Sequence, residues 1–115
     1  MYTTCASLLL ILLFAMPANG NPVPCTGCNC CAAHLITVTT TGAGAHAMAS
    51  DVIIEDGQCS VRTFTCRGKE ANIEVNDDGV VSGPSEAKFT VTCNAAGTAW
   101  EAQGLVVRAV ECASL

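Results

Sequence analysis

From residue 34 onward, apolar and polar residues alternate along the chain in short runs. In EAKFTVTC (86–93), every second residue is alanine, phenylalanine, valine or cysteine, and the residues between them are lysine and threonine. This period of two predicts a strand with one face in the core and one face in water. Four further runs predict strands in the same way: HLITVTTT (34–41), CSVRTFTC (59–66), ANIEVN (71–76) and GLVVRAVEC (104–112).

Turn-forming residues separate these runs, as in Asp56-Gly57, Ser82-Gly83-Pro84 and Asn94-Ala95-Ala96-Gly97. The alanine-rich segment 42–51 is predicted as a loop that leads into a strand over Val52–Glu55. Short strands joined by short polar turns are typical of an all-β fold. We therefore expect a small antiparallel, disulfide-rich sandwich or barrel of about six to eight short strands.

The N-terminal residues have a different pattern. Residues 7–16 form an uncharged apolar run, which is too short to cross a bilayer core about 30 Å thick. Pro17 follows, and Ala18 and Gly20 supply the small residues that precede a cleavage site. We interpret residues 1–20 as a secretory signal peptide, with a short membrane anchor as the alternative, and expect the protein to be secreted and extracellular. Residues 21–30 are expected to form an extended cysteine-rich arm, and residues 31–115 a β-rich domain.

Cysteine content explains how so small a domain could be stable. Nine cysteines occur in 115 residues, and removal of the signal peptide leaves eight, an even number. In an oxidising compartment these predict four disulfides. Aromatic side chains beyond the signal peptide are only Phe64, Phe89 and Trp100, so the core is small. The eight cysteines are Cys25, Cys28, Cys30, Cys31, Cys59, Cys66, Cys93 and Cys112.

Geometry limits the pairing of these cysteines. Cys59 and Cys66 lie on one predicted strand, about 23 Å apart if it is extended, whereas bridged Cα atoms lie within about 7 Å. These two therefore cannot pair with each other. The adjacent Cys30 and Cys31 are expected to have different partners. Spacing alone leaves the rest of the connectivity open.

Zinc is the alternative use of clustered cysteines. Cys28-x-x-Cys31 has the spacing of a metal-binding knuckle, but a tetrahedral site needs a second matching pair. The downstream spacing is Cys59-x6-Cys66, and the two histidines, His34 and His46, are not spaced as ligands. We expect no metal site and no cofactor.

Beyond the signal peptide, the order and spacing of several motifs resemble the nematode six-cysteine domain, a family of small extracellular domains of unknown function. The resemblance covers nearly all of this region and rests on Cys28 and Cys31 followed by Ile36, Cys59-x6-Cys66-x-Gly68, Ile73-x-x-Asn76-x-x-Gly79, Cys93-Asn94-x-x-Gly97-x-x-Trp100, and Val110-Glu111-Cys112. It implies secretion and a β-rich disulfide domain, with no known activity. Cys25 and Cys30 are additional to the pattern and could form a fourth bridge or an intermolecular one.

Charge and composition exclude some classes of function. The net charge is −5, with five lysines and arginines, which argues against binding to nucleic acid or to an anionic membrane. Nucleophilic catalysis needs a base beside a serine or cysteine, and the candidate bases are His34 and His46. His34 is expected on the strand face of Ile36 and Val38, and His46 in the alanine-rich loop. We therefore expect no catalytic residue and no enzyme.

Two functional hypotheses remain. The first is a non-catalytic binding or structural module that contacts an unknown extracellular protein or matrix component through loops 42–50, 67–70 and 94–99. The second is a secreted inhibitor or effector that presents the rigid segment Val81–Ser85 to a hydrolase, because a constrained loop loses little entropy on binding. Arg62, Arg67 and Lys69 are expected on a solvated strand face.

Overall fold

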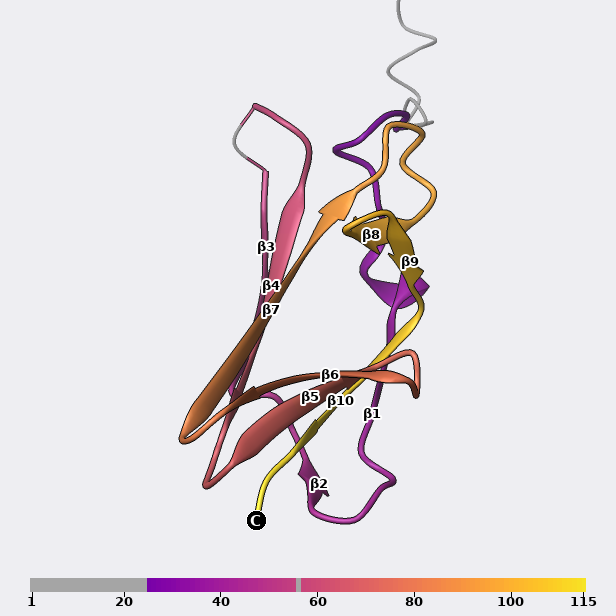
Figure 1. The fold of residues 1–115 in the computed structure, drawn as a ribbon. Helices are drawn as coiled ribbons and strands as arrows, with labels where there is room; N and C mark the ends of the chain where they lie inside the picture. The colour runs from indigo at the N-terminus through magenta and orange to yellow at the C-terminus, as the bar shows by residue number, and fades with distance from the viewer. Residues whose placement is uncertain (1–24, 56) are drawn as a thin grey trace, which may run out of the picture.

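The computed structural model describes residues 25–55 and 57–115, so the expected signal peptide and the first part of the arm lie outside the described residues. The described chain is all-β apart from one short 3-10 helix, Ala33–Leu35, and contains ten strands (Figure 1). The strands are β1 (Thr37–Thr39), β2 (Ala45–His46), β3 (Ser50–Ile54), β4 (Val61–Arg67), β5 (Ala71–Val75), β6 (Gly79–Gly83), β7 (Glu86–Cys93), β8 (Trp100–Ala102), β9 (Leu105–Val107) and β10 (Ala109–Ala113).

The strands form two sheets that face each other. One sheet, called here the β10 sheet, has the order β1-β10-β5-β6, and β2 also pairs with β10. The other, the β7 sheet, has the order β3-β4-β7-β8-β9. Neighbouring strands are antiparallel except β1 and β10, which are parallel. The predicted all-β, disulfide-rich fold is confirmed. Of the two predicted architectures, sandwich or barrel, the described residues form two sheets, with ten strands in place of six to eight.

Alternation places the core between the sheets. In β5, Ala71, Ile73 and Val75 are buried, and the residues between them are partly exposed. The largest fully buried side chains are Trp100 and Phe64, which come from two strands of the β7 sheet. A period of two therefore fills one continuous interior with residues from both sheets.

Two predicted strands are interrupted. The run 104–112 forms β9 and β10, separated at Arg108, where the chain passes from one sheet to the other. The side chain of Asn76 holds this crossing, because its Oδ1 accepts from the backbone N–H groups of Arg108 and Ala109 and its Nδ2 donates to the carbonyl of Val106. A local pattern cannot reveal this break, because its cause is 30 residues away.

The run 34–41 also differs from its prediction. Residues 33–35 form the 3-10 helix and the strand covers only Thr37–Thr39. His34 is exposed on the helix, so the expectation that it shares a strand face with Ile36 and Val38 is wrong. In the alanine-rich segment, β2 forms at residues 45–46, and the following strand runs over 50–54 rather than 52–55.

Four disulfides join the eight cysteines: Cys25–Cys30, Cys28–Cys59, Cys31–Cys93 and Cys66–Cys112. Cys66 in β4 and Cys112 in β10 belong to different sheets, and both are fully buried. Cys31–Cys93 joins the segment before the 3-10 helix to the end of β7, and Cys25–Cys30 closes a loop within the arm. As expected, Cys59 and Cys66 do not pair, and Cys30 and Cys31 have different partners.

One arginine is buried in the interior. Arg62 is 4% exposed, and its guanidinium forms a bidentate ion pair with Asp51 at 2.7 and 2.8 Å. It also donates to the carbonyl of Ala33 and lies 4.7 Å from the centre of the Phe64 ring. The expected position on a solvated strand face is therefore wrong for Arg62. Its charge is fully paired and ties the 3-10 helix to the β7 sheet.

One carboxylate anchors the loop after β1. Oε2 of Glu111 accepts from the hydroxyl of Thr39 at 2.7 Å and from the backbone N–H of Thr41 at 2.8 Å, and Oε1 accepts from the N–H of Gly42. The hydrogen bond from the Thr39 hydroxyl is the largest cause that holds the pKa of Glu111 below its usual value of 4.5, and the two backbone donors add to it.

The disulfides are expected to contribute unequally to stability. The entropy of loop closure predicts that loss of Cys66–Cys112, with a sequence separation of 46, costs about 4 kcal/mol, and that loss of Cys25–Cys30, with a separation of 5, costs about 2 kcal/mol. Denaturant unfolding of the Cys66→Ala/Cys112→Ala and Cys25→Ala/Cys30→Ala variants measures both values. Equal losses would contradict the dependence of the stabilisation on loop length.

The Glu111 anchor predicts a pH-dependent stability. Because its pKa is lower in the folded state than in the unfolded state, its stabilisation is complete above about pH 4.5 and is lost as the pH falls through the folded-state pKa. Glu111→Gln should lower the melting temperature at pH 7, and the difference from wild type should shrink toward pH 3. Glu74→Gln, at the directly opposite position on β5, is the control and should not lower it. A difference that stays constant with pH would refute the prediction.

Candidate functional site

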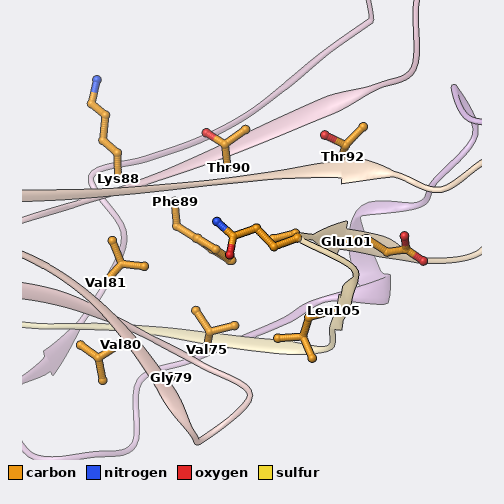
Figure 2. Close-up of a pocket in the computed structure, with 12 residues that line it drawn as sticks. Val75, Gly79, Val80, Val81, Lys88, Phe89, Thr90, Thr92, Glu101 and Leu105 are labelled. Carbon is orange, nitrogen blue, oxygen red and sulfur yellow. The ribbon is translucent and has the colours of Figure 1, made fainter.

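The main concave site is a groove of about 530 Å³ between the two sheets (Figure 2). One wall is the edge strand β6 with the end of β5, and the other consists of β7 and the β8–β9 hairpin. In Figure 2, Phe89 points from β7 into the groove, whereas Lys88, Thr90 and Thr92 point away from it. The lining residues are Val75, Gly79, Val80, Val81, Lys88, Phe89, Thr90, Thr92, Glu101, Ala102, Gln103 and Leu105.

Divergence of the two sheets forms the groove. β6 and β7 leave their short connection and separate, and the β8–β9 hairpin lies beyond the wider end of the gap (Figure 1). Gly83 permits the tight connection, because a Cβ at this position would collide with the carbonyl oxygen of Glu86. The groove is therefore a part of the interior that the core side chains leave unfilled and open to solvent.

Apolar side chains form the base of the groove, whereas five of its twelve lining residues are polar or charged. Val75 is buried at its base, and Phe89 and Val81 are partly buried. Two large apolar side chains are exposed beside it, Val80 at 58% and Leu105 at 53%. Apolar residues gathered around a concave surface are typical of a binding site.

Charged side chains near the groove are few. Glu101 and Lys88 are among the lining residues, and Lys88 lies 4.0 Å from Glu86. A hydrogen bond from Arg67 at 2.9 Å holds the pKa of Glu86 below its usual value. A ligand at the base of the groove would therefore contact apolar side chains, and the charged side chains lie at the margins of the groove.

Neither histidine lies at the groove. His34 is exposed, and His46 in β2 lies beside the C-terminal segment, with Nε2 2.8 Å from Oγ of Ser114. The backbone N–H groups of Ser114 and Leu115 donate to the carbonyls of Gly44 and Lys69, so they are not free to stabilise an oxyanion. These bonds fasten the end of the chain to β2 and to the β4–β5 turn.

His46 also lies close to two sulfur atoms. Its Nδ1 is 3.5 Å from Sγ of Cys112, and ligand atoms of His46, Cys66 and Cys112 lie within 4.8 Å of one another. The two sulfurs are joined in a disulfide, so they are not thiolates that could bind zinc.

The loops predicted to contact a ligand do not form one site. Loops 42–50 and 67–70 come together at one end of the molecule, where Gly68 lies against Ser114 and His46. Loop 94–99 lies at the other end, beside the arm, where Gly97 approaches Gly27 (Figure 1). None of the three loops lines the groove.

The segment proposed for an inhibitor is not a free loop. Residues 81–83 belong to β6, and the carbonyls of Pro84 and Ser85 accept from the backbone N–H groups of Glu70 and Gly68. These bonds hold the β6–β7 connection against the β4–β5 turn.

Sequence reasoning missed the groove, although one signal for it was present. Val80 and Val81 are adjacent, so strict alternation directs one of them to each face of β6. The outer face of β6 therefore carries an exposed aliphatic residue, Val80, whereas the outer positions of β7 are polar.

In the described part of the chain, no helix has the length and apolar character needed to span a bilayer.

Comparison with known proteins identifies the family. Residues 31–112 match the model of the C6 domain, and the match contains five of the eight described cysteines. Cys28, which pairs with Cys59, lies just before it. The chain is also similar to an uncharacterized protein of Caenorhabditis elegans, with 28% identity over 98 residues that cover 80% of this chain and 68% of the relative. No solved structure matches the chain. Because the match spans most of its length, the chain belongs to the C6 domain family.

Proposed function

We propose that this chain is a secreted, non-catalytic binding module that holds an apolar segment of an extracellular partner protein in the groove between its two sheets. The observation that carries the proposal is the groove itself. Its volume of about 530 Å³ is within the usual range for ligand sites, and its base is formed by aliphatic and aromatic side chains.

The rigidity of the walls supports the same function. Cys66–Cys112 fixes the β10 sheet against the β7 sheet, and Asn76 holds the β9–β10 crossing beside the groove. A preformed groove loses little conformational entropy when a ligand enters. Burial of the exposed Leu105 side chain would add apolar contact area on binding.

Secretion is part of the proposal. The apolar run at residues 7–16, the small residues before position 21 and the four disulfides all suit an extracellular protein.

Expression in secreting cells tests this part. The purified protein should begin at Asn21 and should have the mass of a chain in which all eight remaining cysteines are oxidised. Intact-mass spectrometry, with and without reduction, measures both properties. A retained Met1 or free thiols in the native protein would contradict secretion through a cleaved signal peptide.

The groove is tested with peptides selected from a random displayed library against the oxidised protein. Leu105→Lys places a charge at the apolar margin without disturbing the buried core, and should weaken the selected peptides at least tenfold, by about 1.4 kcal/mol or more. Val52→Lys, at a position that is 48% exposed on β3, is the matched control and should change affinity less than twofold. Isothermal titration calorimetry measures both.

Two results would refute the proposed site. One is a selection that enriches no peptide above background. The other is a set of bound peptides whose affinity is the same for wild type and Leu105→Lys.

A further inference from the structure

The five edge strands of the two described sheets differ in their protection against pairing with another chain. β1 and β9 have three residues each and β2 has two, and short edges pair poorly. β3 has five residues, but its Asp51 is ion-paired with the buried Arg62, so a charge points inward at that edge. β6 also has five residues, GVVSG, without a charge or a proline and in unbroken register with β5. β6 is therefore the unprotected edge.

The hydrogen-bond pattern of β5 indicates which backbone groups of β6 are free. The N–H of Asn76, which follows β5, donates to the carbonyl of Ala109, the first residue of β10. In an antiparallel sheet alternate residues bond to opposite neighbours, so Val75 and Ile73 bond toward β6. Their partners in β6 are Gly79 and Val81. The N–H and C=O groups of the residues between, Val80 and Ser82, consequently point to the open edge.

This open edge lies beside the groove. Gly79, Val80 and Val81 line it, and Figure 2 shows Val81 on the side of Phe89 while Val80 points away. A strand that paired with β6 would direct every second side chain toward the groove and the others toward solvent. The groove thus favours a segment with aliphatic residues at alternate positions.

The charges around β6 are mostly acidic, and Lys88, which also lines the groove, points away from it (Figure 2). Asp77 and Asp78 form the turn before its first residue, and Glu70 lines a hollow beside its last residues. Across the groove lies Glu101. Among the described residues, these four carboxylates take part in no ion pair. A partner segment with lysine or arginine between its aliphatic residues would complement them.

We propose that an extended basic segment of a partner protein binds as an added strand on β6, with alternate aliphatic side chains in the groove. The inference rests on the proposed function, because it assigns the partner of the same groove. A second copy of the chain is a poorer occupant. Antiparallel pairing of two β6 strands would place the Asp77–Asp78 end of one copy beside the Glu70 end of the other, and these like charges repel.

The test uses a seven-residue peptide in which lysine and valine alternate, beginning and ending with lysine. Fluorescence anisotropy should detect its binding to the oxidised protein, and a counterpart with glutamate in place of lysine should bind at least tenfold more weakly. In the added strand, the N–H groups of the valines point to one edge and those of the lysines to the other. N-methylation of one of these two sets should therefore weaken binding at least tenfold, and methylation of the other set less than threefold.

Two variants of β6 give an independent readout. Val80→Pro removes the N–H that points to the open edge, and proline is tolerated at such edge positions. Val80→Ala removes most of the same side chain but keeps the N–H. Val80→Pro should bind the lysine–valine peptide at least tenfold more weakly than Val80→Ala, with the four disulfides and the melting temperature preserved. If Val80→Pro does not fold, the N-methylated peptides still decide the question.

Each contrary outcome has a distinct meaning. Peptide binding that is lost in Leu105→Lys but unaffected by either N-methylation would overturn strand addition and leave the groove as the site. Preference for the glutamate peptide would overturn the assignment of a basic partner. Dimerisation of the protein alone in sedimentation, abolished by Val80→Pro, would identify a second copy as the occupant and overturn the proposal.

Discussion

The Cys66–Cys112 disulfide crosses the interior from β4 to β10 and fixes the two sheets to each other. The interior around it contains two fully buried aromatic rings, Phe64 and Trp100, because the third, Phe89, lies at the groove. A core of this size yields limited apolar burial, so a covalent link that restricts the unfolded chain supplies a large share of the stability. The sheets can therefore diverge on one side without separating, and this divergence is what opens the groove.

Two charged side chains hold the 3-10 helix and the loop after β1, which strand pairing does not hold. The bidentate pair of Arg62 and Asp51, with the bond to Ala33, fastens the 3-10 helix. Glu111 fastens the loop after β1 through four hydrogen bonds. Arg62 and Glu111 lie in regular strands. Each binds backbone groups of a segment that has no strand partner of its own. Hydrogen bonds to charged groups are stronger than those between neutral groups, so two side chains are enough to order both segments.

The sequence reveals those features of the fold that are local. Alternation in 86–93 and 71–76 predicts β7 and β5, and the adjacency of Cys30 and Cys31 excludes a shared partner. The sequence does not reveal the burial of Arg62. Alternation places it on the face of Phe64 and Cys66, but burial of its charge depends on a partner, Asp51, that lies on another strand. The break at Arg108 depends on Asn76 in the same way. The groove is still less predictable, because it depends on the angle between two sheets and on which strand lies at an edge.

The position of β10 in the sheet has a consequence for biogenesis. β10 follows every other strand in the chain, yet it lies in the middle of its sheet, between β5 on one side and β1 and β2 on the other. During synthesis, β1 and β5 therefore have no shared neighbour until β10 has been made, and Cys66 cannot form its native bond until Cys112 has been made. Meanwhile Cys66 is a free thiol among earlier cysteines with which it could form the wrong bond. Because the native bond of Cys66 requires Cys112 in β10, any earlier bond of Cys66 has to be exchanged before the two sheets can be linked.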